Sequence, residues 1–103
     1  GHKGCDIIAP AGTPIIASDN GVVQAAGWNN GGYGNYVVID HGNGWRTLYG
    51  HMLQVAVQSG QAVEAGQVIG YVGNTGDSYG NHCHFEMYYN NSLVSAREFF
   101  PNM

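Results

Sequence analysis

The sequence predicts an all-β protein, built as a compact antiparallel sheet or sandwich with little or no helix. Two observations lead to this fold class. Short segments rich in β-branched and aromatic residues alternate with clusters of glycine, asparagine and aspartate, as strands alternate with turns. In addition, no amphipathic helical period continues for three turns anywhere in the 103 residues.

The expected strands follow one another in order along the chain. We expect them over residues 14–17, 21–25, 36–40, 45–49, 67–72 and 82–88. Glycine and asparagine predict the connections: a hairpin loop at 40–44, tight turns with a positive-φ glycine at 19–21 and 74–77, and a longer loop at 29–34. A single helical turn is expected at 95–99, and two glycine-glutamine turns within 57–70 resemble the hairpins of lipoyl-type carrier domains.

Length and composition exclude several classes of protein. A chain of 103 residues is expected to be one domain, 1–103, with a modest core. Its net charge is -4 and it has no basic run, which argues against nucleic acid or an anionic membrane as a partner. Apolar runs are too short for a transmembrane helix. A carrier domain needs a lysine at a hairpin tip, and the only lysine is Lys3.

Histidine and aspartate gather in three separate segments: His2-Lys3-Gly4-Cys5-Asp6, Gly50-His51 and His82-Cys83-His84. Imidazole and carboxylate are common zinc ligands. In a strand, alternate side chains share a face, so His82 and His84 point the same way. If residues 2–6 are also extended and pair with this strand, one face offers His2, Asp6, His82 and His84. Three of these would hold a metal and leave a position for water, while the remaining histidine and His51 act as base and oxyanion donor.

Each of these features also has an interpretation without catalysis or metal binding. A His-x-His pair on an edge strand is usually surface, Gly1-His2 could be a tag remnant, and His41 in a predicted turn reads as structural or solvated. The seven tyrosines are more often strand packing than substrate contacts. The same geometry places Cys5 and Cys83 on the opposite face, where a disulfide between them and two packed thiols are the alternatives.

With these motifs in order, the chain resembles the lysostaphin/LytM-type zinc metallopeptidases, which cleave peptide bonds in bacterial peptidoglycan. The family is marked by His-x-x-x-Asp and His-x-His, here His2 to Asp6 and His82 to His84. The likeness continues through segments 9–15, 19–23, 33–39, 49–52, 60–70 and 73–76. It covers nearly the whole chain and also weakens the tag interpretation of His2.

The resemblance implies a role for each motif residue. One zinc ion per domain would be held by His2, Asp6 and His84, and the catalytic pair would be His51 and His82. The substrate would be peptidoglycan peptides, and the chain would be a monomeric catalytic domain from a longer secreted or envelope protein. Relatives usually carry an upstream oxyanion tyrosine that this chain does not place, and aliphatic residues where Cys5 and Cys83 stand. The alternative is a non-catalytic cell-wall-binding or hydrolase-activating module of the same fold.

Overall fold

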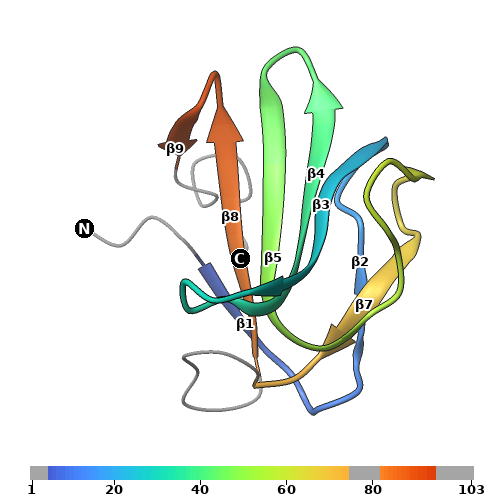
Figure 1. Cartoon of the computed structure of the whole chain (residues 1–103), viewed down its shortest axis with the longest axis vertical. Coiled ribbons are helices and arrows are strands. Elements are labelled where there is room, and N and C mark those ends of the chain that lie inside the picture. Colours follow the sequence, from blue (N-terminus) through green and yellow to red (C-terminus); the bar gives the residue numbers. More distant parts are fainter. Residues whose placement is uncertain (1–4, 75–81, 95–103) are drawn as a thin grey trace.

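The structure, a computed structural model, describes residues 5–74 and 82–94, with side chains from residue 7 onward (Figure 1). The described part of the chain is all-β, as predicted. Its strands are β1 (Cys5–Ile8), β2 (Pro14–Ile16), β3 (Gly21–Asn29), β4 (Gly34–Gly42), β5 (Trp45–Val55), β6 (Ala62–Val63), β7 (Val68–Val72), β8 (His82–Tyr89) and β9 (Ser92–Val94). Within those residues no helix is long and apolar enough to cross a membrane.

All strand pairs are antiparallel and belong to one curled sheet (Figure 1). The main order is β1-β8-β5-β4-β3-β6. The pair β2–β7 joins this path through β7, which also pairs with β5, and β9 pairs with β8. This topology places the first and eighth strands side by side, with β5 on the other side of β8. It therefore brings Asp6 of the first motif, His51 and the His82-Cys83-His84 motif to adjacent strands.

The six predicted strands are confirmed as β2, β3, β4, β5, β7 and β8, although β3, β4 and β5 extend well beyond the predicted ranges. β1 overlaps the segment 2–6 that was considered as an extended segment, and the short strands β6 and β9 had no counterpart in the prediction. The predicted helical turn at 95–99 lies outside the described residues, as do 75–77 of the predicted turn at 74–77.

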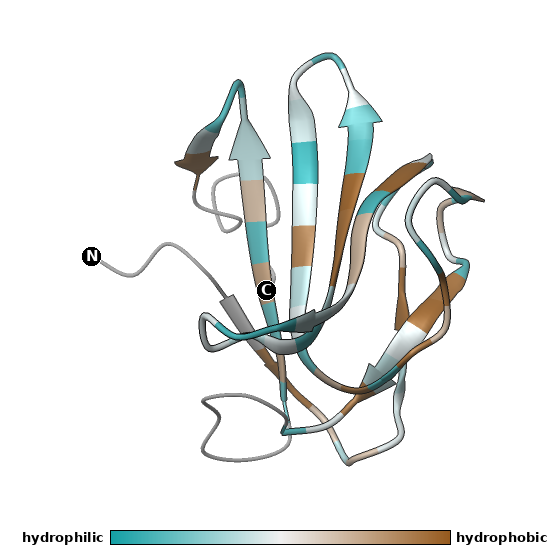
Figure 2. Ribbon diagram, in the orientation of Figure 1, coloured by the Kyte–Doolittle hydropathy of each residue, from teal (hydrophilic) through white to brown (hydrophobic). Residues whose placement is uncertain are grey.

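The hairpin between β4 and β5 turns at Asn43 and Gly44, whose φ angles are 55° and 87°. Two successive positive φ angles are the signature of a type I′ turn, which explains the Asn-Gly pair. The tips of this hairpin and of the β8–β9 hairpin are hydrophilic (Figure 2). The prediction of a positive φ at Gly21 was wrong. This glycine starts β3, and a Cβ there would lie 2.5 Å from the Asp40 carbonyl oxygen, so close packing requires it.

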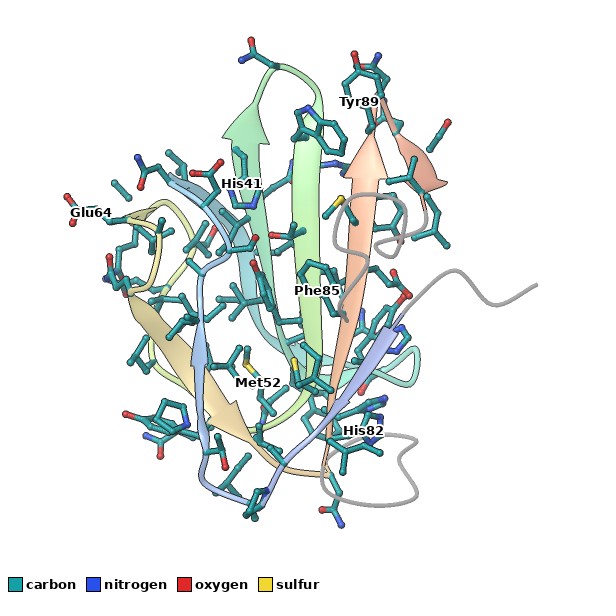
Figure 3. All side chains as sticks on the ribbon, turned by 180° about the vertical axis from the view of Figure 1, so that it is seen from behind. His41, Met52, Glu64, His82, Phe85 and Tyr89 are labelled. Carbon is teal, nitrogen blue, oxygen red and sulfur yellow. The ribbon has the colours of Figure 1, made fainter. Side chains whose placement is uncertain are left out.

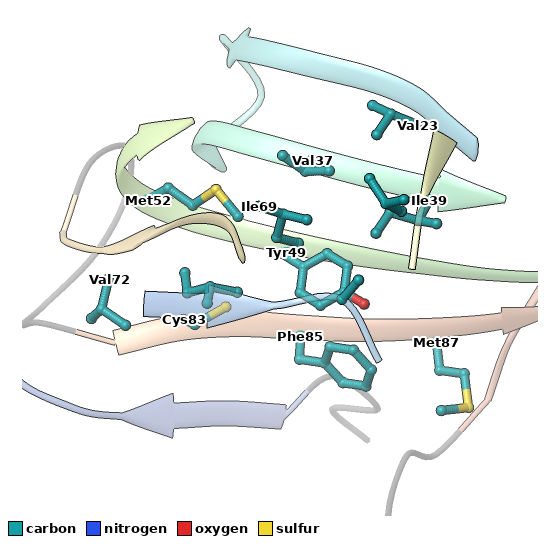
Figure 4. Close-up of a cluster of buried hydrophobic side chains, with 13 residues drawn as sticks. Val23, Val37, Ile39, Tyr49, Met52, Ile69, Val72, Cys83, Phe85 and Met87 are labelled. Atoms are coloured by element: carbon teal, nitrogen blue, oxygen red, sulfur yellow. The ribbon is translucent and has the colours of Figure 1, made fainter. Parts of the chain in front are cut away.

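The core fills the inside of the curl (Figure 4). Along β4, Val37 and Ile39 are fully buried while their neighbours are more exposed, the period-2 pattern of a one-sided strand. By contrast, β5 and β8 are buried on both faces over residues 47–52 and 83–87. One face of β8 supplies Cys83, Phe85 and Met87 to the core. Its other face carries His84 and Glu86, which are buried although they are polar. Their burial belongs to the candidate site described below.

Candidate active site

Strand β8 positions two of the predicted site residues. His82 and His84 alternate with the core residues Cys83 and Phe85, and Figure 3 shows His82 near the start of the strand. On one edge of β8, the register places Asp6 of β1 opposite His84, and on the other edge it places Gly50 of β5 opposite the same residue. The expected pairing of the first and last motifs is therefore present in the backbone. His2 and the side chain of Asp6 lie outside the described part of the chain.

His51 joins the two histidines from β5. Its ring centroid lies 4.9 Å from that of His82 and 6.0 Å from that of His84. His51 and His84 are each 7% exposed, whereas His82 is only partly buried. His51, which is 31 and 33 residues away from the other two in sequence, thus forms one cluster with them, and His82 has the most accessible ring of the three.

A β-bulge at residues 50–51 turns His51 into this cluster. Between the pairs Val37–Tyr49 and Asn35–Met52, β5 has one residue more than β4. Tyr49 and Met52 both lie in the core although they are three positions apart, which would put them on opposite faces of a regular strand, so the alternation of faces changes between them. The backbone of His51 has a φ of 59°, and its N–H donates to the Tyr33 carbonyl oxygen at 2.6 Å. In a regular strand residue 51 would face the core, as Tyr49 does. Because of the bulge, the His51 side chain lies instead beside His82 and His84.

Glu86 is a site residue that the sequence prediction missed. Its carboxylate Oε2 lies 2.8 Å from His84 Nε2, and it accepts hydrogen bonds from the hydroxyls of Tyr33 (3.0 and 2.8 Å) and Tyr88 (2.5 Å). The ring of Tyr33 also stacks on His84 with centroids 5.9 Å apart. A signal existed in the sequence, because Glu86 follows His84 by two residues and must share its face of the strand. Tyr33 gave no such signal.

These contacts shift the pKa values of Glu86, Tyr88 and Tyr33. Burial would raise the pKa of Glu86, but hydrogen bonds from His84, Tyr88 and Tyr33 outweigh it and hold the pKa at about 2. Burial, together with the hydrogen bond to Glu86, raises the pKa of Tyr88 to about 12 and that of Tyr33 further still. At neutral pH Glu86 is therefore a carboxylate, and Tyr33 and Tyr88 are neutral phenols.

His41 lies apart from the cluster. Its Nδ1 is 2.8 Å from the Asn20 carbonyl oxygen and its Nε2 is 2.6 Å from Thr47 Oγ1. These contacts tie the β4–β5 hairpin to the turn before β3, which agrees with the structural role expected for this residue.

The cysteines occupy offset positions on β1 and β8. The register pairs Cys5 with Phe85 and Cys83 with Ile7, so the two cysteines are diagonal neighbours rather than directly opposite. Diagonal positions in an antiparallel pair are about 7–8 Å apart, at or beyond the upper limit for a disulfide. The Cys5 side chain lies outside the described residues, and the disulfide stays a prediction.

The donor chemistry near His84 fits a metal such as zinc. Among the side chains that the structure describes, no group of three histidine, cysteine, aspartate or glutamate residues forms a complete metal site. Two of the three predicted ligands are not among those side chains. The third, His84, engages a carboxylate through Nε2, which is the arrangement that supports a metal-ligating histidine elsewhere. Asp6 sits opposite it in register.

Comparison with known proteins agrees with this geometry. Peptidase family M23 matches residues 1–96. The peptidoglycan DD-endopeptidase ShyA of Vibrio cholerae is 44% identical over 95 residues, which are 92% of this chain but 22% of ShyA. The chain thus spans about a fifth of the length of the curated relatives it matches first.

Two solved structures show the same fold. The catalytic domain of the antimicrobial peptidase lysostaphin from Staphylococcus simulans superposes with a TM-score of 0.90 at 34% identity, covering 98% of this chain and 80% of that one. A zinc-containing peptidase from Vibrio cholerae gives a TM-score of 0.83 at 37% identity, covering 90% of this chain and 28% of that one. From the motifs, the curled sheet and these matches together, the chain belongs to peptidase family M23.

Proposed function

We propose that this chain is a zinc-dependent endopeptidase that hydrolyses peptide bonds in the cross-links or bridges of bacterial peptidoglycan. The observation that carries the proposal is the meeting of His51, His82 and His84 in one cluster, with Asp6 opposite His84 in register. The M23 family and the activity named for ShyA support the substrate class. The zinc-containing relative supports the choice of metal.

In this proposal His2, Asp6 and His84 hold the metal. When bound, zinc lowers the pKa of a water ligand and polarises the scissile carbonyl. His82, half-buried at the edge of the cluster, is the ring that a substrate can reach. One of the two rings His51 and His82 takes the proton from the attacking water, and the other donates a hydrogen bond to the carbonyl oxygen as its charge develops.

The setting of the reaction follows from the substrate. Peptidoglycan lies outside the cytoplasmic membrane, so we place the protein in the cell envelope or outside the cell. We further propose that it acts as a monomer, and that residues 1–103 form the catalytic domain of a longer protein.

Digestion of purified peptidoglycan tests the proposal. We expect the protein to release peptide fragments, an added chelator to stop their release, and re-added zinc to restore it. Mass spectrometry of products from defined fragments then identifies the bond that is cut. Intact peptidoglycan after incubation with the zinc-loaded protein would contradict the proposal and favour a cell-wall-binding module.

A further inference from the structure

We propose that Glu86, held in place by Tyr33 and Tyr88, is a positioning residue that fixes the proton of His84 on Nε2 and so presents Nδ1 for metal binding. This inference rests on the proposed function, because it assigns a support to one of the metal ligands.

The placement of Glu86 is the first argument. Glu86 is only 8% exposed, and its partner on the neighbouring strand β5 is the apolar Leu48. A buried carboxylate is costly unless hydrogen bonds satisfy it. Here three side chains do so, with contacts to both carboxylate oxygens. The group is therefore built into the strand face beside His84 and is not a surface charge.

The direction of the hydrogen bonds is the second argument. Tyrosine hydroxyls donate to both oxygens of Glu86, and a carboxylate has no proton of its own to give, so the contact at 2.8 Å assigns the donor role to His84 Nε2. A neutral imidazole carries one ring proton, and with that proton on Nε2 the lone pair able to coordinate a metal is on Nδ1. Without Glu86 the Nε2 proton would lose this acceptor, and the carboxylate would no longer favour the Nε2–H tautomer.

The tyrosines hold the carboxylate itself. Tyr33 Oη bonds both carboxylate oxygens and Tyr88 Oη bonds one of them. Tyr33 is fixed by stacking between Tyr36 and His84, with centroids 6.3 and 5.9 Å away. The guanidinium of Arg46 lies 5.2 Å from the centre of the Tyr88 ring. Both phenols are thus anchored independently of the bonds that they donate.

Four variants test this role: Glu86→Leu, which removes the acceptor, Glu86→Gln, whose amide oxygen can still accept from Nε2, Tyr33→Phe, and Tyr89→Phe as a control. Tyr89 packs on Trp45 at the far end of β8. We expect Glu86→Leu to weaken zinc affinity by about 10–100-fold, measured by competition with a chromogenic chelator. Glu86→Gln should have a zinc affinity close to that of the wild type. Tyr33→Phe should bind zinc several-fold more weakly than the wild type, and Tyr89→Phe should bind it equally well.

A second readout needs no metal. Proton–nitrogen correlation NMR of the metal-free protein at alkaline pH should show the Nε2–H tautomer of His84 in the wild type and a mixture in Glu86→Leu. If the leucine variant does not fold, Tyr33→Phe carries the same comparison. Wild-type zinc affinity in Glu86→Leu, or an Nδ1–H tautomer in the wild type, would overturn the inference even while zinc-dependent hydrolysis persists. A wild type with the Nε2–H tautomer that binds no zinc would instead overturn the proposed function, and the metal-binding role with it.

Discussion

His51 has a backbone conformation that is costly for any residue other than glycine. Its φ of 59° lies in the left-handed region, which is unfavourable for any residue with a Cβ by roughly 1–2 kcal/mol. The hydrogen bond from its N–H to the Tyr33 carbonyl oxygen and the bulge in β5 keep it there. Residues held in sparsely populated backbone regions cluster at active sites. We therefore attribute the conformation of His51 to its place beside His82 and His84.

Replacing His51 separates the backbone conformation from the imidazole. Both His51→Ala and His51→Gly should lose peptidoglycan hydrolysis, because neither has a ring to move a proton. The glycine variant should be about 1 kcal/mol more stable than the alanine variant, since glycine adopts a positive φ without strain. Urea unfolding of the two variants measures the difference. Equal stabilities would show that position 51 is not strained.

At this scale the sequence was informative about the histidines but not about their supports. The spacing of His82 and His84 predicted a shared face, and the register of β1 and β8 places Asp6 opposite His84. Glu86 could have been found by the same period-2 argument. Tyr33 could not, because its role depends on how the loop after β3 folds back onto β8, and no local pattern encodes that contact.

At the scale of elements, a chain of hydroxyl groups ties the β2–β3 connection to β5. Tyr49 is buried, and its hydroxyl lies 2.9 Å from Ser18 Oγ, 3.1 Å from the Ser18 backbone nitrogen and 2.8 Å from Thr47 Oγ1. Burial raises the pKa of Tyr49, although the bonds with Ser18 and Thr47 partly offset it. The fold therefore favours the neutral phenol.

This network predicts how stability depends on alkaline pH. A raised pKa in the folded state gives stability that is fully present below the tyrosine value of about 10 and is lost as pH rises through the folded pKa. Tyr49→Phe should cost about 1–3 kcal/mol at neutral pH, because it leaves polar partners without their bond. The difference in the free energy of unfolding between the wild type and Tyr49→Phe should become smaller above pH ~10. Urea unfolding across this pH range measures it, and a constant gap would contradict the prediction.

Strand patterns predicted most of the sheet, and the exceptions have physical reasons. The bulge in β5 was not predicted, although Gly50 inside the strand is a weak signal for one, because one glycine does not fix which way the next side chain turns. Gly21 was assigned to a turn conformation because glycine often supplies positive φ, whereas here it is needed for close approach to β4. In both cases a tertiary contact, and not local preference, decides the backbone.

At the scale of the whole molecule, the curled sheet assembles a site from segments that are distant in the chain. β8 runs between β1 and β5, so residues near positions 6, 51 and 84 become neighbours only when the sheet forms. The site and the core share β8, with histidines and Glu86 on one face and Cys83, Phe85 and Met87 on the other. Substitutions that disturb the packing of Cys83, Phe85 or Met87 should therefore also disturb the site.

The predicted bridge between Cys5 and Cys83 is also a whole-molecule property, since it would tie β1 to β8 beside the proposed metal ligands. A bridge predicts that alkylation of the unfolded, unreduced protein adds no label to its mass, and that labels appear after reduction. Two labels without reductant would exclude the bridge. The diagonal register of the two positions sets the geometric demand that a bridge must meet.

In the proposed mechanism the two histidines of β8 have different tasks, with His84 holding the metal and His82 acting on the substrate. The most direct test measures bound zinc and peptidoglycan hydrolysis together in His82→Ala and His84→Ala. We predict that His82→Ala keeps its zinc and loses hydrolysis, whereas His84→Ala loses both. Full hydrolysis by His82→Ala, or undiminished zinc in His84→Ala, would contradict the account.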